Sequence, residues 1–281
     1  MQEKEFKTTA LKQISTHKKR DMMKEINIIT HNKVDLSNSL LIVAFPTVGL
    51  VSIISARFIV ESLKLEEIGS IESPYLIPAT AIHDGIPLPP VRIFAGRKTC
   101  GPNVSCSQLV IILSEFMPPW EIMIPLTDAI IDWAQQKKCK YIVTLEGINI
   151  VDEEALAKPN VYGLGTTTAT RDLLNQFHIE ESNDGLITGI SGVLLYKAVQ
   201  KKLDMLCFLS EVHVSYPDSR NAGRLLEKLN FLIPDIKIDP KPLYIEAELI
   251  EHTIQTFMQQ AKTTAEHMQR NGSDVIPRMY G

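Results

Sequence analysis

The chain has 281 residues, of which 44% are hydrophobic and 22% charged, and its formal net charge is −4. This is the composition of a soluble globular protein, long enough for one large domain with an appendage, and it lacks the concentrated positive charge of most nucleic-acid binders. No apolar run approaches the roughly 18–20 residues that cross a bilayer, and the polar first 25 residues lack the apolar centre of a secretory signal, so we expect a cytoplasmic protein that binds neither nucleic acid nor membrane.

Cysteine and histidine spacing predicts no metal site. The four cysteines, Cys100, Cys106, Cys139 and Cys207, form no C-x-x-C pair and follow no zinc pattern. The seven histidines are scattered, without the spacing of a metal-binding pair. We therefore expect free thiols in a reducing cytoplasm, with no metal and no cofactor.

The predicted core begins with a buried strand and a helix joined by a tight turn. Leu40–Phe45 is a continuous apolar run of strand length, as in buried parallel strands. Pro46, Thr47 and Gly49 form the turn, and from Val48 to Leu63 the apolar positions recur at helical spacing. This order of strand, turn and helix is the start of a βαβ unit.

Further strands and helices alternate along the chain. Strands are predicted at 65–73, 76–84, 91–95, 109–113 and 140–148, shortly before Thr166, at the start of 185–203, and at 204–212. Helices are predicted at 122–137, after a cap at Thr166, Thr167 or Thr168, in the later part of 185–203, and after a cap at Asp218 or Ser219. The alternation predicts a three-layer α/β/α sandwich around a mainly parallel sheet of about six core strands.

We expect four parts in the chain: a polar segment at 1–25, the α/β/α core at 26–238, a long helix at 239–270 and a flexible tail at 271–281. In the long helix the apolar residues recur at spacings that alternate mostly between four and three, which forms a heptad-like seam. Such a seam either packs on its own domain or also pairs with a neighbouring subunit, and both interpretations stay open.

Three short motifs partly resemble known binding or catalytic motifs. The turn "FPTVGL" places free backbone N–H groups at the start of a helix, which is a position where anions bind. It lacks the lysine of a Walker A loop and the third glycine of a dinucleotide fingerprint. Gly49 is equally explained by the need for a small residue in a tight turn. Ser191 lies in "TGISG", whose glycine spacing is wrong for a nucleophile elbow. His83 and Asp84 are adjacent on a predicted strand and would point to opposite faces.

Three carboxylates, Glu115, Glu146 and Glu211, directly follow or end apolar strands. Because α/β folds bind ligands at the carboxyl ends of their strands, these side chains could line one pocket together with the Gly49 turn. The alternative is that they cap helices or pair with arginines. No complete catalytic constellation is visible in the sequence.

Six segments together resemble the proteasome assembly chaperone 2 family, in particular its archaeal members. In chain order they are "FPTVGLVSIISARFIVESL", "IHDGIPLPPVRIF", "LVIILSEFMPP", "YIVTLEGI", "DGLITGISGVLL" and "YPDSRNAGRLLEKL". The resemblance implies an α/β/α core similar to the purine nucleoside phosphorylase-like fold, without the catalytic residues of those enzymes. It also implies a homo-oligomer and, in some archaeal members, binding to the α-ring of the 20S proteasome.

Proteasome-binding members of this family resemble proteasome activators in ending with a hydrophobic residue, a tyrosine and any last residue. Here that pattern falls on Met279, Tyr280 and Gly281. Tyr280 offers an apolar ring with a hydroxyl, Met279 adapts to an uneven pocket, and the carboxylate of Gly281 can pair with a lysine of the receiving pocket. Residues 271–281 could reach about 35–40 Å at roughly 3.3–3.6 Å per residue. The alternative is an accidental terminus.

We therefore expect a non-catalytic, ATP-independent binder of 20S proteasome α subunits that assists α-ring assembly, docks on the mature particle, or does both. The alternative hypothesis is an enzyme of a phosphorylase-like fold that acts on a small anionic substrate, with Gly49, Glu115 and Glu146 in its pocket. A third possibility is an oligomeric scaffold for another partner.

Overall fold

The computed structural model describes residues 25–31, 34–101, 105–149, 160–212 and 217–233, together with parts of a helix at 245, 252–253, 255–260 and 262–263. The expected polar segment at 1–25 falls almost wholly outside the described residues, and the tail at 271–281 falls outside them entirely. Between 252 and 263 the described residues are helical, as expected for the long helix. The boundaries of the four predicted parts remain predictions.

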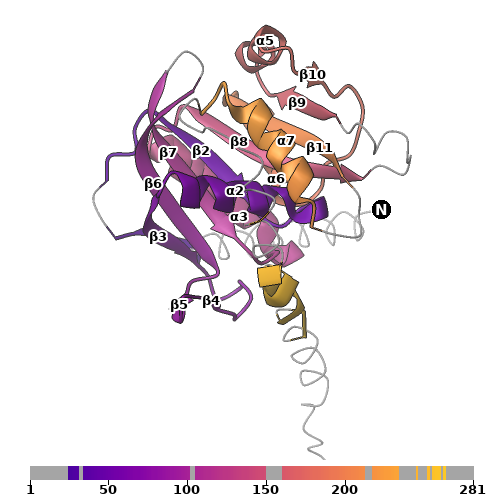
Figure 1. The fold of residues 1–281 in the computed structure, drawn as a ribbon. Helices are drawn as coiled ribbons and strands as arrows, with labels where there is room; N and C mark the ends of the chain where they lie inside the picture. The colour runs from indigo at the N-terminus through magenta and orange to yellow at the C-terminus, as the bar shows by residue number, and fades with distance from the viewer. Residues whose placement is uncertain are drawn as a thin grey trace, which may run out of the picture.

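A nine-stranded mixed sheet forms the centre of the molecule (Figure 1). Its strands, in spatial order, are β1 (Asn27–Thr30), β3 (Glu66–Glu72), β6 (Val91–Cys100), β7 (Cys106–Ser114), β2 (Ser39–Ala44), β8 (Tyr141–Asn149), β11 (Met205–Val212), β9 (Val161–Gly165) and β10 (Glu180–Glu181). The four central strands β7, β2, β8 and β11 are parallel, whereas β1, β3 and β6 extend the sheet in antiparallel fashion and β9 runs antiparallel to β11.

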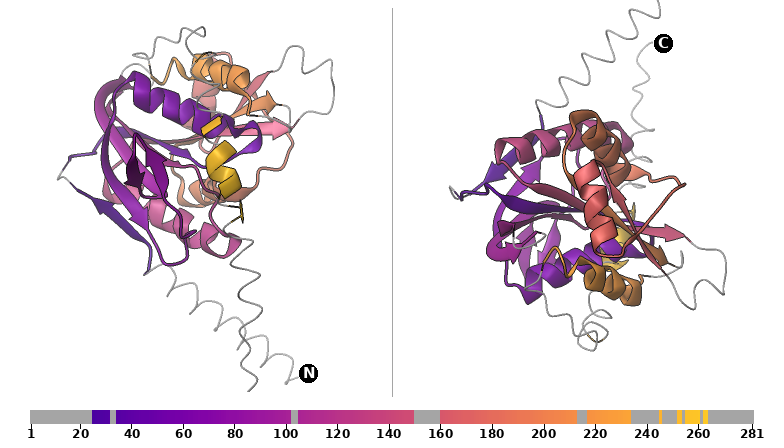
Figure 2. Two further views of the ribbon diagram at one scale, coloured as in Figure 1. Left: turned by 60° about the horizontal axis from the view of Figure 1, so that its bottom comes forward. Right: turned by 90° about the horizontal axis from the view of Figure 1, so that it is seen from above.

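Helices cover both faces of this sheet (Figure 2). The helices are α2 (Val51–Ser62), α3 (Trp120–Gln136), α5 (Thr168–Gln176), α6 (Gly189–Lys201) and α7 (Ser219–Leu229), with a short 3-10 turn η1 (Val48–Leu50) before α2. The first apolar core joins the sheet to α2 and α7, and the second joins its other face to α3 and α6. Every side chain of β2 is buried, as expected for a central parallel strand covered on both faces.

The predicted α/β/α sandwich with a parallel centre is confirmed, and the antiparallel edges make the sheet as a whole mixed. The predicted caps also lie where the sequence placed them. Thr167 accepts the N–H of Thr170 in a capping box, and the Asp218 carboxylate accepts the N–H of Asn221 at 3.0 Å.

Two predicted strands differ from the structure. Within 76–84 only β4 (Ala81–His83) is a strand, and it pairs with β5 (Ile86–Leu88) in a separate two-stranded hairpin. Residues 185–188 form no strand, because β9 and β11 already pair with each other and leave no free position beside them. The sheet has nine strands where about six core strands were expected, and two of those not predicted are the short β1, of four residues, and β10, of two glutamates.

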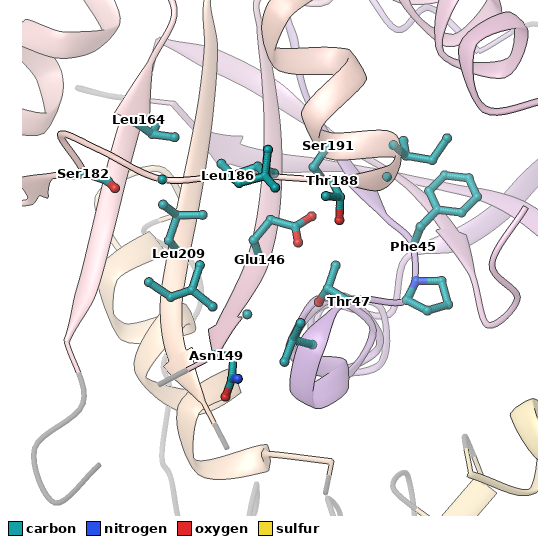
Figure 3. A pocket seen from close by; sticks show the side chains of 18 of the residues that line it. Phe45, Thr47, Glu146, Asn149, Leu164, Ser182, Leu186, Thr188, Ser191 and Leu209 are labelled. Atoms are coloured by element: carbon teal, nitrogen blue, oxygen red, sulfur yellow. The ribbon is translucent and has the colours of Figure 1, made fainter. Parts of the chain in front are cut away.

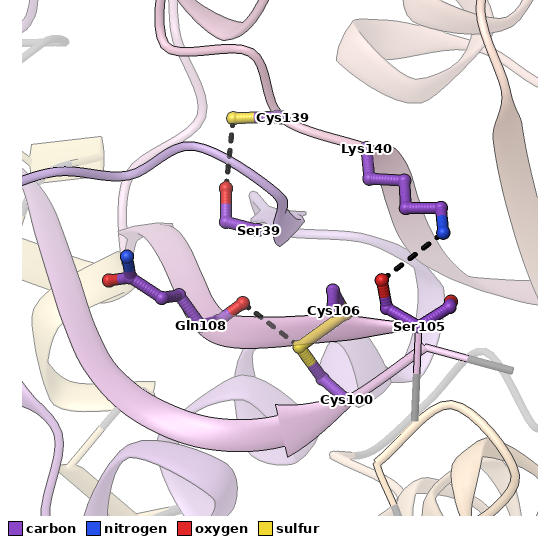
Figure 4. Close-up of a disulfide and its surroundings, with 7 residues drawn as sticks. All are labelled: Ser39, Cys100, Ser105, Cys106, Gln108, Cys139 and Lys140. Carbon is purple, nitrogen blue, oxygen red and sulfur yellow. Dashed lines mark hydrogen bonds between the residues drawn. A yellow bond between two sulfur atoms is a disulfide. The ribbon is translucent and has the colours of Figure 1, made fainter. Parts of the chain in front are cut away.

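The expectation of four free thiols is wrong for one pair. The antiparallel ladder of β6 and β7 places Cys100 opposite Cys106, with their Cα atoms 4.9 Å apart, and the two sulfur atoms are bonded (Figure 4). Gly101 follows with φ of +74°, a conformation that favours glycine. Cys139 and Cys207 are free thiols, as expected.

Within the described part of the chain, no helix is both long and apolar enough to cross a bilayer.

The turn after β2 docks against two distant segments. Gly49 adopts φ of +64°, and its carbonyl oxygen accepts the N–H of Asp218 at 2.7 Å, which ties the turn to the start of α7. The carbonyl oxygen of Val48 lies so close to Gly147 of β8 that a Cβ atom built on Gly147 would be 2.0 Å from it. A side chain at position 147 is therefore incompatible with this packing.

We predict that Gly147→Ala lowers the free energy of unfolding by about 1–3 kcal/mol or more, because either the turn or β8 must shift. Chemical denaturation monitored by circular dichroism measures the change. The matched control is Gly185→Ala, where a Cβ atom would meet nothing within 4 Å. Equal stability of the two variants would contradict this close approach.

Candidate functional site

A cavity of about 730 Å³ lies at the carboxyl ends of the central strands (Figure 3). Its walls come from the turn after β2 (45–48), the end of β8 (146–149), the segment 182–188 and the first turn of α6 (189–191). Leu164 of β9, Leu209 of β11, Met117 and Met258 complete the lining. This is the edge where α/β sheets place their ligands, and the volume is within the range of small-molecule pockets.

Two glycines let the walls of the cavity pack closely. Gly147 accommodates the Val48 carbonyl oxygen, and a Cβ atom on Gly192 of α6 would lie 2.3 Å from the carbonyl oxygen of Ile187. Ile187 thus lies directly against Gly192 near the start of α6. The shape of the cavity depends on backbone contacts that larger residues would prevent.

Glu146 is the one predicted site residue that the structure places in this cavity. Its side chain is only 9% exposed, and burial raises the pKa of its carboxyl to about 8, although a hydrogen bond with the Ser191 hydroxyl acts in the opposite direction. The described lining residues include Asp184 at the exposed rim but no lysine, arginine or histidine. The carboxyl group has no cationic partner among them.

Glu115 lies elsewhere, in a buried ion cluster on the α2 face of the sheet. Its Oε1 atom accepts hydrogen bonds from Arg57 of α2, at 3.2 Å, and from Arg92 of β6. Arg92 also lies over the ring of Phe94. The expectation that Glu115 shares a pocket with Glu146 is wrong for this cavity, and the alternative of pairing with arginines describes its environment.

Gly49 and Glu211 do not line the cavity either. Gly49 lies behind the turn, against the side chain of Val212. Glu211 accepts the N–H of Asn160 at 2.7 Å and the hydroxyl of Tyr162 at 3.1 Å. The three strand-end glutamates therefore occupy three different environments, and of the three only Glu146 lines this cavity.

The remaining candidates have simple surroundings. Ser191 lies in the first turn of α6, beside Glu146. His83 and Asp84 lie at the exposed turn of the hairpin, where their side chains are 3.7 Å apart. Among the described residues, no group of three histidine, cysteine, aspartate or glutamate side chains could hold a metal ion.

Sequence reasoning missed the residues that reach the cavity from distant segments, in particular Met117, Met258 and the segment 182–188. Met258 packs against the first apolar core, so this part of the C-terminal helix contacts its own domain. Because Met258 is not a seam residue, this contact does not decide between the two interpretations of the heptad-like seam, and both stay predictions. Met258 itself is not one of the seam residues, which include Phe257, so no sequence signal pointed to it.

We predict that Glu115→Gln lowers the free energy of unfolding by about 3–5 kcal/mol, because it removes the buried anion shared by two buried guanidinium groups and leaves Arg57 with only the partly exposed Glu61. The matched control is Glu61→Gln. Glu61 pairs with the same Arg57 at 3.2 Å but is 43% exposed, so its loss should cost less than about 1 kcal/mol. Urea denaturation measures both, and equal effects would contradict a structural role for the buried cluster.

We predict a pH-dependent gain in relative stability for Glu146→Gln. The folded state holds the Glu146 proton up to about pH 8, whereas the ordinary carboxyl pKa is 4.5, so the folded state binds more protons than the unfolded chain between these values. The contribution of Glu146 to stability is therefore full below pH 4.5 and is lost, at about 1.4 kcal/mol per pH unit, as the pH rises to 8.

Glutamine cannot ionise, so the unfolding free energy of the variant should rise relative to wild type from pH 5 to 8 and then level off. Urea denaturation at several pH values measures the difference. The value near pH 5, where the two side chains are both neutral in the folded state, is the internal control. A difference that is constant across this range would show that burial does not raise the pKa of Glu146.

Comparison with known proteins agrees with the fold and with the family inferred from the sequence. A protein of Methanocaldococcus jannaschii, described as uncharacterized, is 29% identical over 241 residues, which cover 85% of this chain and 93% of that protein. The structure of Pyrococcus furiosus PbaA, an archaeal homolog of proteasome-assembly chaperone, matches with a TM-score of 0.70 at 24% identity and covers 86% of this chain and 99% of its own. The monoclinic crystal form of the same protein matches with a TM-score of 0.68 at 25% identity, and the match covers 90% of this chain and 99% of that chain.

The fold is also that of Pyrococcus furiosus PbaB, an archaeal proteasome activator, with a TM-score of 0.67 at 18% identity over 83% of this chain and 98% of that chain. The model of the PAC2 family matches residues 41–258, which include the central strands, all the helices of both layers and the walls of the cavity. The chain belongs to the PAC2 family.

Proposed function

We propose that this protein is a non-catalytic, ATP-independent partner of the 20S proteasome in the cytoplasm, which contacts the α-ring and assists its assembly or acts on the mature particle. Membership of the PAC2 family carries the proposal, together with the likeness to PbaA and PbaB, whose descriptions name proteasome assembly and proteasome activation. The environments of Glu115 and Glu211 also favour a binding protein, because their carboxylates are held by neighbours within the fold.

In this proposal Met279, Tyr280 and Gly281 dock in a groove between α subunits. Tyr280 fills the groove with its ring, Met279 fills an uneven apolar pocket, and the terminal carboxylate of Gly281 forms a charge-assisted pair with a lysine. Pro277 restricts the free tail and so reduces the conformational entropy that docking costs. One tail of this size binds weakly, which makes the number of tails decisive.

We propose that the protein is a homo-oligomer, because several tails facing a ring of repeated pockets gain from a high effective concentration. Apolar side chains on α3 and α6 support self-association through this face: Trp120 is 74% exposed, and Ile124, Tyr196 and Val199 are exposed as well. The two helices pack side by side and are joined by ion pairs of Lys197 with Asp128 and of Lys201 with Asp132. A second copy of the chain is the occupant that we assign to this face.

We predict that deletion of Met279–Gly281 abolishes binding to an archaeal α-ring, because it removes the apolar anchor and displaces the carboxylate together. Surface plasmon resonance on immobilised α-rings measures binding, and peptide hydrolysis by the mature 20S particle separates activation from assembly. Adding one glycine after Gly281 should weaken binding as strongly, since it moves the carboxylate away from Tyr280.

The matched control deletes three residues from the stem, 271–273, and keeps the terminal motif. This variant shortens the reach by only about 10 Å and should still bind. Sedimentation equilibrium of each variant checks that the number of subunits is unchanged. Undiminished binding after deletion of Met279–Gly281 would remove the tail from the mechanism, and a monomeric wild-type protein would contradict the multivalent proposal.

A further inference from the structure

The three strand-end glutamates differ in how their charge is balanced. Glu115 accepts hydrogen bonds from two arginines, and Glu211 accepts from a backbone N–H and a tyrosine hydroxyl. Glu146 has the Ser191 hydroxyl and no cation among the described residues that surround the cavity. It is also the one of the three that faces an open volume, so its missing partner can come from outside the protein.

The cavity around Glu146 is apolar in most of its lining. Phe45, Leu164, Ile190 and Leu209 contribute hydrocarbon surface, and the Glu146 carboxyl points across the space toward Thr188 at the start of α6 (Figure 3). The hydroxyl of Thr47 is buried in the cavity wall and has no hydrogen-bond partner in the described part of the chain. An apolar chamber with one carboxyl and a few hydroxyl groups suits a ligand with a single polar end.

The sign of the ligand charge follows from the surrounding charges. Asp184 of the rim is the other titratable group in the lining, and the fully buried Cys207 of β11 lies near enough for Glu146 to affect it. Burial together with the nearby Glu146 raises the pKa of the Cys207 thiol. All three groups are neutral or negative. An anionic ligand would find no cation among the described lining residues, a neutral ligand would gain hydrogen bonds alone, and a cation would supply the opposite charge to an ionised Glu146.

We propose that this cavity binds a small primary amine, whose ammonium group pairs with the carboxylate of Glu146 and whose apolar body packs against the surrounding hydrocarbon side chains. The start of α6 assists the pairing, since its N-terminal end and the Ser191 hydroxyl both stabilise the carboxylate. The Thr47 hydroxyl accepts a second N–H of the ammonium group.

Binding of the ammonium group is coupled to release of a proton. Below about pH 8 the empty site holds its proton on Glu146, and pairing with the ligand lowers the pKa of this carboxyl and expels the proton to solvent. The affinity therefore rises as the pH increases toward 8. A neutral ligand would release no proton and would show no such rise.

The test uses two sets of probes that share a ring system and differ in charge: tryptamine, tryptophol and indole-3-propionate, and 1-adamantylamine, 1-adamantanol and adamantane-1-carboxylate. Isothermal titration calorimetry on the full chain should show that at least one amine binds with a millimolar or lower dissociation constant. Its neutral and anionic counterparts should bind at least about tenfold more weakly than the amine. Titrations in two buffers of different ionisation enthalpy should show proton release at pH 6.5.

Glu146→Gln should lose about tenfold or more in amine affinity and all of the proton release. The matched control is Glu211→Gln, the same substitution on the neighbouring strand outside the cavity, which should leave both unchanged. The proposal is overturned if neither amine binds wild-type protein, if the alcohol or the carboxylate of a set binds as tightly as its amine, or if Glu146→Gln retains amine binding.

A final probe identifies the source of the amine. Nα-acetyl-lysine methylamide carries the same ammonium group on a peptide backbone. Weaker binding of this probe than of the best free amine supports a small-molecule ligand. Tighter binding would overturn that assignment and give the site to a lysine side chain of a protein.

Discussion

The contact between the Val48 carbonyl oxygen and Gly147 governs the carboxyl edge of the sheet. It holds the turn after β2 against the end of β8, and the hydrogen bond from Asp218 to Gly49 holds the same turn against α7. The first wall of the cavity and the start of α2 are therefore positioned by backbone contacts. A turn that did not pack against β8 would leave the Glu146 carboxyl exposed to water, and the burial that raises its pKa would be lost.

The elements that could be predicted are those whose signal is local. The apolar runs of the central strands and the caps at Thr167 and Asp218 each depend on a few neighbouring residues, and they lie where the sequence placed them. The Cys100–Cys106 bond and the course of 185–188 depend on which strands pair, which no local pattern encodes. The cavity was predicted only through Glu146 and the turn after β2, because its other walls come from segments far apart in the chain.

Glu115, Glu146 and Glu211 show why a shared position in an α/β fold does not imply a shared role. All three follow or end apolar strands at the same edge, yet their neighbours differ in charge. Two arginines make Glu115 part of the core, and a tyrosine and a backbone amide fix Glu211. Glu146 lines the cavity and has no cationic partner among the described residues around it. The proposed contact with the proteasome, through 279–281, and the proposed ligand cavity around Glu146 are on separate parts of this chain.

The ion pairs between α3 and α6 have a consequence for assembly. Lys197 pairs with Asp128 and Lys201 with Asp132, so the partners are four residues apart on both helices. A slide by one helical turn would bring Lys197 to Asp132 but would break both existing pairs, so a single alignment of the helices satisfies both pairs at once. The exposed apolar side chains of α3 and α6 are consequently held at one fixed spacing. A partner surface that packs on them must match this spacing, which ion pairs within the chain itself determine.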